Sequence, residues 1–337
     1  MEHVVFRRCM AEKVEWEEIS MKKFMVLVLA LCLVLMGIPA LADDTVYKVG
    51  VCQQLQHPAL DQATQGFKDA LEAKLGDKVD IVVSNASNDK NLCATIANQF
   101  VSDDVDLIMA NATDALKACF SATMDIPVLG TSITEYSVAL DLDSATFTGV
   151  TGMNVSGTSD LAPLNEQAAM IKEWFPEAKT VGLLYCSAEA NSLYQVREIA
   201  KFLTEMGIES KEYAFTDSND IAAVAQQAIA NDVIYIPTDN TAAAYTETIA
   251  NVVIPAGVPV IAGEEGICSG CGVATLTISY YDIGYKTGEM AYDILVNGAK
   301  VEEMPIQYAP QFTKKYNAAN VEALKLTVPE GYVAIGE

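Results

Sequence analysis

The sequence has very few histidines and arginines. Of its two histidines, only His57 lies after residue 42, and Arg197 is the only arginine after that point. These absences exclude a Ser-His-Asp triad away from His57, a histidine-based metal cage and the arginine clamp that phosphate or dicarboxylate ligands usually require. No G-x-G-x-x-G or Walker pattern occurs either. We therefore expect no metal, no cofactor and no enzymatic activity.

Positive charge is also scarce. The 337 residues include 21 Lys and Arg against 45 Asp and Glu, which gives a formal net charge of −24. Such an acidic surface repels nucleic acids and anionic lipids. We therefore expect no nucleic-acid partner.

Residues 21–42 have the pattern of a secretory signal peptide. Lys22 and Lys23 precede an apolar run over residues 24–36, Pro39 follows it, and Ala40-Leu41-Ala42 forms an A-x-A cleavage site. Cleavage after Ala42 predicts an exported protein, periplasmic or extracellular at the cell surface. The alternative is a membrane anchor, because residues 24–42 are long enough to span a bilayer.

Residues 1–20 precede this signal and show no helical or strand periodicity. Trp16-Glu17-Glu18 can be encoded by a purine-rich run of the ribosome-binding kind. Our hypothesis is that residues 1–20 are an upstream extension that is not native, that the true start is Met21, and that the chain is bacterial.

From residue 46 onward, short β-like runs alternate with helical ones. Four such steps up to residue 130 predict one parallel sheet, and a second series over residues 161–262 predicts another. Residues 147–157 are rich in Gly and Thr and read as an extended crossing between the two parts. The expected fold class is α/β, with two lobes that are each a doubly wound parallel sheet flanked by helices.

A polar cluster follows one strand of the second sheet. The apolar run 233–236 leads through Pro237 into Thr238-Asp239-Asn240-Thr241, and a helix is expected over residues 242–253. Ligands in doubly wound sheets bind outside the carboxyl ends of the strands, so the cluster reads as a recognition loop. The alternative is that these residues only cap the helix.

The chemistry of these strand ends suits a zwitterion. Asp239 is the expected partner of a ligand ammonium, with Glu189 and Glu264 as alternatives. A ligand carboxylate would be bound by hydroxyls, amides and helix N-termini. The candidates for this role are Ser187, Asn191 and Ser192 in lobe 2 and Asn111, Thr113, Thr131 and Ser132 in lobe 1. For each of these residues an ordinary cap or turn role is the alternative.

Two aromatic side chains could complete the pocket. His57 follows the first strand and could form a wall of the site, or serve only in the start of a helix. Tyr280 follows the run 273–279 and could stack on an aromatic ligand, or pack in the core.

Six cysteines follow the signal, and Cys268-Ser-Gly-Cys271 is their only close pair. Outside the cytoplasm a local disulfide is the first interpretation of this pair. Cys93 and Cys119 lie in helical patterns and read as buried thiols, with pairing as the alternative.

Several motifs together resemble a known family. They are Tyr185-Cys-Ser-Ala-Glu-Ala-Asn-Ser192, Tyr235-Ile-Pro-Thr-Asp-Asn-Thr241, Ile261-Ala-Gly-Glu-Glu-Gly266, Ile278-Ser-Tyr-Tyr-Asp-Ile-Gly284 and His57-Pro-Ala-Leu-Asp61. In combination they resemble the ABC-transporter substrate-binding proteins of the tryptophan/tyrosine-binding type. The resemblance implies a type I periplasmic-binding-protein fold. It places residues 43–150 and 268–303 in lobe 1, and residues 151–267 and 304–337 in lobe 2.

The resemblance also implies a function. We expect a monomeric solute-binding protein that captures an amino acid, tryptophan, tyrosine or phenylalanine, and delivers it to a membrane permease driven by a cytoplasmic ATPase. One alternative is a receptor for another small solute, such as a peptide, purine or sugar, that feeds a transporter or a sensor. The other is a secreted α/β enzyme.

Overall fold

The computed structural model describes residues 45–336. The predicted upstream extension and signal peptide lie outside this range. Within it, no helix combines the length and the apolar character needed to cross a membrane.

Lobe 1 is built on a six-stranded sheet with the order β11-β5-β4-β3-β1-β2, and all of its strand pairs are parallel. Its strands are β1 (Tyr47–Gln53), β2 (Val79–Asn85), β3 (Leu107–Asn111), β4 (Val128–Ile133), β5 (Val155–Ser159) and β11 (Gln307–Tyr308). Its helices are α2 (Pro58–Leu75), α3 (Lys90–Ser102), α4 (Thr113–Ala122), α5 (Tyr136–Ala139) and α12 (Tyr280–Leu295), with short 3-10 turns at Gly76–Lys78 and Val301–Glu303.

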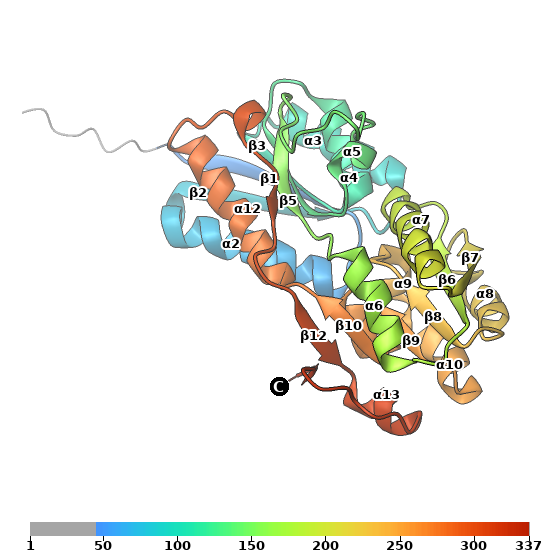
Figure 1. The fold of residues 1–337 in the computed structure, drawn as a ribbon. Helices are drawn as coiled ribbons and strands as arrows, with labels where there is room; N and C mark the ends of the chain where they lie inside the picture. Colours follow the sequence, from blue (N-terminus) through green and yellow to red (C-terminus); the bar gives the residue numbers. More distant parts are fainter. Residues whose placement is uncertain (1–44, 337) are drawn as a thin grey trace, which may run out of the picture. The chain divides into compact units, whose positions relative to one another are not determined.

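The two long helices of lobe 1, α2 and α12, lie side by side although they are far apart in the sequence (Figure 1). Glycines allow this approach. A Cβ on Gly66 would lie 2.1 Å from the Tyr281 carbonyl oxygen, and one on Gly284 would lie 2.0 Å from that of Ala63. The packing thus brings a late segment of the chain back to the first lobe.

Lobe 2 is built on a seven-stranded sheet with the order β13-β12-β10-β9-β8-β6-β7. Only the β10–β12 pair is antiparallel among the strand pairs of the described chain. The strands are β6 (Thr180–Cys186), β7 (Glu209–Phe215), β8 (Val233–Ile236), β9 (Val260–Ala262), β10 (Ala274–Thr277), β12 (Thr313–Tyr316) and β13 (Val333–Ala334). The helices are α6 (Leu164–Trp174), α7 (Ala190–Glu205), α8 (Ile221–Ala228), α9 (Asn240–Ala244), α10 (Thr246–Ala256), α11 (Glu265–Gly270) and α13 (Ala318–Ala323).

The apolar strand runs that predicted the two sheets form their cores. Val49, Val51, Leu107 and Leu129 are buried under α2 and α12 in lobe 1. In lobe 2 the four residues of β8 are all buried. Burial on both faces is what a parallel sheet covered by helices requires. The expected α/β fold with two sheets is therefore present.

The chain crosses between the lobes later than the sequence indicated. The expected boundary at residue 150 precedes β5, which pairs with β4 in lobe 1. The boundary at 267 precedes β10, which pairs with β9 in lobe 2, and β11 pairs with β5 beyond the boundary at 303. Strand hydrogen bonds therefore put the crossings at about residues 160, 279 and 310.

The cysteines are all free and buried in the described chain. This differs from the predicted Cys268–Cys271 bridge. Cys268 lies within α11, and the sulfur of Cys271 lies 3.4 Å from the Ile267 carbonyl oxygen, to which its thiol donates a hydrogen bond.

Candidate functional site

The carboxyl ends of strands from both sheets enclose a small, buried cavity. Eight of the predicted residues line it, namely His57, Ser132, Asn191, Thr238, Asp239, Asn240, Glu264 and Tyr280, together with Leu60, Thr134, Asp160 and Ala243. Its volume is about 10 Å³, which is room for about one water molecule. The structure therefore shows the lobes closed on each other, and a ligand larger than a water molecule enters only when they separate.

Asp239 is buried at the end of β8, but its carboxylate binds the backbone. Oδ1 accepts a hydrogen bond from Ala242 N at 2.8 Å and caps α9, and Oδ2 accepts one from Cys186 N at 2.6 Å at the end of β6. The structure thus shows the helix-cap role that was the alternative for this residue. Burial, and next the neighbouring Glu189 carboxylate, raise the pKa of Asp239.

Glu189 organises the loop that follows β8. Its Oε1 accepts hydrogen bonds from the backbone and hydroxyl of Thr241, and its Oε2 accepts from the backbone and side-chain amides of Asn240 and from Asn191 Nδ2. Five donors occupy this carboxylate. Its role is to hold the polar cluster in place.

Glu264 follows β9 and caps α11. Its two oxygens accept hydrogen bonds from the backbone N–H groups of Gly266 and Ile267. Burial is the main cause that raises its pKa, to about 7. Like the carboxylate of Asp239, the carboxylate of Glu264 already accepts hydrogen bonds from backbone N–H groups.

Asp160 has a different environment, although it is equally buried. It directly follows β5, and its side-chain partners are two hydroxyls, which donate hydrogen bonds to it, from Thr134 at 3.1 Å and from Tyr280 at 2.9 Å. Its own backbone N–H also contacts the carboxylate. Burial raises its pKa to about 6. The ion pairs within residues 45–336 involve none of these four carboxylates. The described chain therefore supplies no counter-ion to these carboxyl groups.

Two polar atoms of the cavity have no hydrogen-bond partner in the described chain. They are Oγ of Ser132, at the end of β4, and Nδ1 of His57, which precedes α2. Ser132 also has a φ of +56°, a conformation that L-residues seldom adopt. Buried polar groups are nearly always paired, so these two atoms point to a ligand.

Hydrogen bonds between the lobes close the cavity. His57 Nε2 lies 3.2 Å from Asn240 Oδ1, Asn88 Nδ2 donates to Thr241 Oγ1 at 3.0 Å, and Lys90 Nζ donates to the Ala188 carbonyl at 2.8 Å. Each joins an early segment of lobe 1 to the start of a helix in lobe 2. These contacts can form only when the lobes are together.

The other predicted residues lie outside the cavity wall. Asn111 donates to the Leu60 carbonyl and to Thr64, Thr131 accepts from Thr158, and Thr113 begins α4 and is buried. In lobe 2, Ser192 accepts from Asn191, Thr241 binds Glu189, and Ser187 is exposed and donates to the Phe215 carbonyl. These side chains support strand ends rather than face the cavity.

The sequence interpretation missed Asp160 and Gln195. Gln195, on α7, donates to Thr238 Oγ1 and accepts from Thr238 N. The signal for Asp160 was available, because it is an acidic residue between an extended run and a helix. It was overlooked because β5 read as part of a crossing. Tyr280 is at the cavity as expected, but its hydroxyl binds Asp160.

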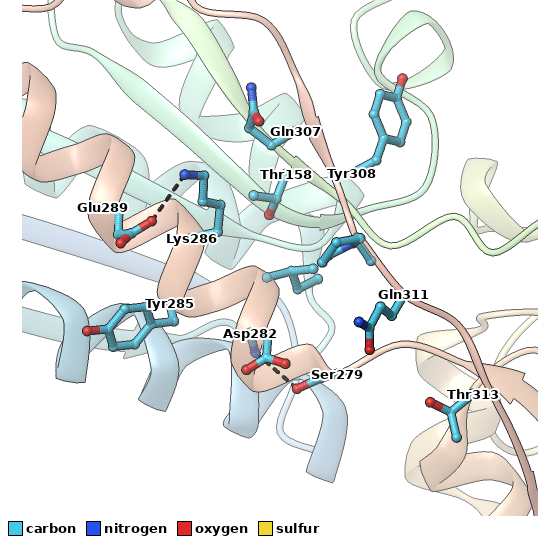
Figure 2. Close-up of a pocket in the computed structure, with 13 residues that line it drawn as sticks. Thr158, Ser279, Asp282, Tyr285, Lys286, Glu289, Gln307, Tyr308, Gln311 and Thr313 are labelled. Atoms are coloured by element: carbon cyan, nitrogen blue, oxygen red, sulfur yellow. Dashed lines mark hydrogen bonds and ion pairs between the residues drawn. The ribbon is translucent and has the colours of Figure 1, made fainter.

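A larger hollow lies elsewhere, along α12, β11 and the crossing that follows β11 (Figure 2). Its volume is about 670 Å³, and an ion pair of 3.1 Å between Lys286 and Glu289 lies on its wall. None of the unpartnered buried atoms of the described chain belongs to its lining. It is a groove beside the crossings rather than the candidate site.

Comparison with known proteins agrees with this architecture. The family model "ABC transporter substrate binding protein" matches residues 48–335. A curated tyrosine-binding protein of Clostridioides difficile (strain R20291) is 33% identical over 285 residues, which are 82% of this chain and 81% of that protein.

Two solved structures show the same fold in different states. The ABC domain of Streptococcus pneumonia in complex with L-Trp is 31% identical, with a TM-score of 0.81, over 86% of this chain and 100% of that one. The ligand-free, open structure of a substrate-binding protein with adhesive properties from Clostridium difficile is 35% identical, with a TM-score of 0.66, over 86% and 99%. The open structure has the lower TM-score of the two although its sequence identity is higher. This difference agrees with lobes that are closed in this chain. The predicted fold is confirmed, and the chain belongs to the family of ABC transporter substrate-binding proteins.

Proposed function

We propose that this substrate-binding protein captures an aromatic amino acid in the cavity between its lobes. The relatives support the ligand class, because one is named a tyrosine-binding protein and another was solved with L-Trp. The cavity supports an amino acid independently, because Asp160 has no ion-pair partner in the described chain and Ser132 has an unpaired hydroxyl, and these two groups complement the two charges of a zwitterion.

The single observation that carries the proposal is the environment of Asp160. Among the four buried carboxylates it alone has only hydroxyls, which can reorient, as its partners from other residues, whereas Asp239 and Glu264 bind backbone N–H groups of helix starts and strand ends. A charge-assisted hydrogen bond from the ligand ammonium to Asp160 offsets the cost of burying this carboxylate. The ammonium role first expected of Asp239 therefore passes to Asp160 in this proposal.

Ser132 supplies a group for the opposite end of the zwitterion. Its hydroxyl is buried, unpartnered and part of the cavity wall. A hydroxyl is both a donor and an acceptor, and donation to a ligand carboxylate gives it the partner that it lacks. The strained backbone at this residue holds its side chain at the strand end.

The closed lobes support a transport role. We propose that the exported protein, cleaved after Ala42, carries the amino acid as a monomer to a permease powered by a cytoplasmic ATPase. No bond of the ligand needs to change in such a role, so the protein is proposed to be non-catalytic. Hydrogen bonds between the lobes, such as that from Asn88 to Thr241, support a closed form that distinguishes loaded from empty protein.

Calorimetric titration of the purified protein tests the ligand class. We expect tryptophan, tyrosine or phenylalanine to bind and to be recovered chemically unchanged by mass spectrometry. At 100 times its dissociation constant such a ligand stabilises the protein by about 2.7 kcal/mol, which a thermal shift detects. A shift with a peptide, purine or sugar, and none with aromatic amino acids, would reject the proposal.

A further inference from the structure

His57 lines the cavity, and one of its ring nitrogens has no hydrogen-bond partner in the described chain. The residue precedes α2 and is 7% exposed, and burial lowers the pKa of its imidazole. Its Nε2 contacts Asn240 Oδ1 across the lobes, whereas its Nδ1 is buried without a partner. The role of this nitrogen depends on which of the two carries the hydrogen.

Neighbouring groups determine that hydrogen's position. The carboxylate of Glu189 accepts from Asn240 Nδ2 at 2.8 Å, and a carboxylate cannot donate in return. The amide of Asn240 is therefore oriented with its oxygen toward His57. An amide oxygen only accepts, so Nε2 of His57 must carry a hydrogen. In the neutral imidazole, Nδ1 then has a free lone pair and acts as an acceptor.

We propose that Nδ1 of His57 accepts a hydrogen bond from the side chain of the bound amino acid, either the indole N–H of tryptophan or the phenolic O–H of tyrosine. His57 would thereby select ligands with a polar ring hydrogen over phenylalanine. The inference rests on the proposed function. In the proposed function the ligand ammonium binds the negatively charged Asp160. The neutral Nδ1 of His57 is then left for a neutral donor, the N–H or O–H of the ligand side chain.

Discrimination follows from the cost of an unpaired buried acceptor. When phenylalanine occupies the site, Nδ1 stays buried with no partner, as it is in the closed structure. A site that binds a polar hydrogen rejects an analogue without one. For a single neutral hydrogen bond we expect a preference of about 5- to 150-fold.

The test uses two matched pairs of ligands on three forms of the protein. The pairs are tyrosine with phenylalanine, and tryptophan with β-(3-benzothienyl)alanine, in which sulfur replaces the ring N–H. His57→Gln places an amide at the position of Nε2 and keeps a donor for Asn240, but has no atom at the position of Nδ1. His57→Asn has an oxygen near the position of Nδ1 but does not reach Asn240.

Calorimetry should show a preference for the polar member of at least one pair in the unmodified protein. His57→Gln should bring the affinities of the two members to within about threefold of each other, while His57→Asn should retain part of the preference. Equal losses for both members in His57→Gln, at an unchanged melting temperature, would overturn the inference and assign Nδ1 to the common part of the ligand. Failure of every aromatic amino acid to bind the unmodified protein would instead reject the proposed function.

Discussion

The hydroxyl of Tyr280 donates a hydrogen bond of 2.9 Å to Oδ2 of Asp160. Asp160 follows the last residue of β5, and Tyr280 is the first residue of α12, so the bond joins two of the segments that cross between the lobes. A ligand that binds Asp160 would therefore lie beside two of these crossing segments.

Replacing Asp160 should weaken ligand binding without unfolding the protein. Asp160→Asn removes the charge but retains an oxygen for the Thr134 or Tyr280 hydroxyl. We expect a loss of about 1.5–3 kcal/mol, or about 10- to 150-fold in affinity, because a charge-assisted hydrogen bond becomes a neutral one. Titration calorimetry with tryptophan and tyrosine measures the loss. Affinity unchanged in this variant would show that the ammonium binds elsewhere.

Asp239→Asn is the matched control for that experiment. Asparagine still caps α9, but its amide nitrogen would face the N–H of Cys186, which now binds Oδ2. We expect a stability loss of about 1–3 kcal/mol from this unsatisfied pair and only a small change in affinity. A large affinity loss at unchanged melting temperature would restore Asp239 as the ammonium partner.

Apolar runs in the sequence predicted the two sheets but not strand β5. Runs such as residues 233–236 are apolar over the length of a strand, and they form buried parallel strands, so the two sheets were predictable. β5 was not, because Val155-Ser-Gly-Thr-Ser159 has no apolar pattern. Its place in the sheet comes from pairing with β4 and β11, which are distant in the sequence.

The candidate site was predictable by position but not by role. Polar residues at strand ends do gather at the cavity, as Asp239, Glu264 and Ser132 show. The sequence does not tell whether a carboxylate at a strand end binds a ligand or caps the next helix, because aspartate and glutamate serve both purposes. The helix expected over residues 242–253 illustrates a further limit, since Tyr245 separates α9 from α10.

Ligand affinity should fall in acid, and the stability of the empty protein should rise. The pKa of Asp160 is raised to about 6, with Tyr280 and Thr134 as its hydroxyl partners and Glu264 as a nearby carboxyl. Below pH 6 Asp160 is protonated and no longer binds an ammonium, so affinity should drop about tenfold per pH unit. Titrations at pH 5, 6, 7 and 8 measure this, and a flat profile would contradict it.

The stability of the empty protein should change with pH in the opposite direction to ligand affinity. A carboxyl with a raised pKa in the folded state binds protons more tightly than in the unfolded chain, so the free energy of unfolding rises as pH falls from above 6 toward 4. The shift of Asp160 corresponds to roughly 3 kcal/mol across that window. Asp160→Asn should flatten the profile, and Glu264→Gln should flatten its part near pH 7.

Removing the hydroxyl of Ser132 should affect binding alone. Ser132→Ala deletes a buried oxygen that has no partner in the described chain, so stability should stay the same or rise slightly. Affinity should fall by about 0.5–1.5 kcal/mol, or about 2- to 12-fold. Thr275→Val is the control, because Thr275 Oγ1 is also buried and unpartnered but lies on β10 outside the cavity wall. Equal affinity losses in both variants would contradict a ligand contact at Ser132.

The six cysteines of the described chain should behave as inert thiols. All are buried, and burial raises the pKa of Cys271, which keeps it as the unreactive thiol. An alkylating reagent should label none of them in the native protein and all six after unfolding, as read by intact mass. Reductant should leave the melting temperature unchanged. A mass two units lower for the peptide that contains Cys268 and Cys271 would restore the predicted disulfide.

The hydrogen bond from Asn88 to Thr241 should slow ligand release. Asn88 follows β2 in lobe 1 and Thr241 lies in α9 of lobe 2, so the bond of 3.0 Å forms only between closed lobes. Asn88→Ala favours the open form by about 0.5–1.5 kcal/mol, which corresponds to a 2- to 12-fold faster dissociation rate with little change in association.

Asn98→Ala is a matched control, since Asn98 is exposed on α3 and binds only the Ala94 carbonyl of the same helix. Stopped-flow fluorescence of the bound aromatic amino acid measures both rates. Asn88 Oδ1 also accepts from Gln54 Nε2, and its φ of +63° favours asparagine over alanine, so the Asn88→Ala variant should also lose some stability without ligand. A slower association rate instead of faster release would show that Asn88 guides ligand entry rather than closure.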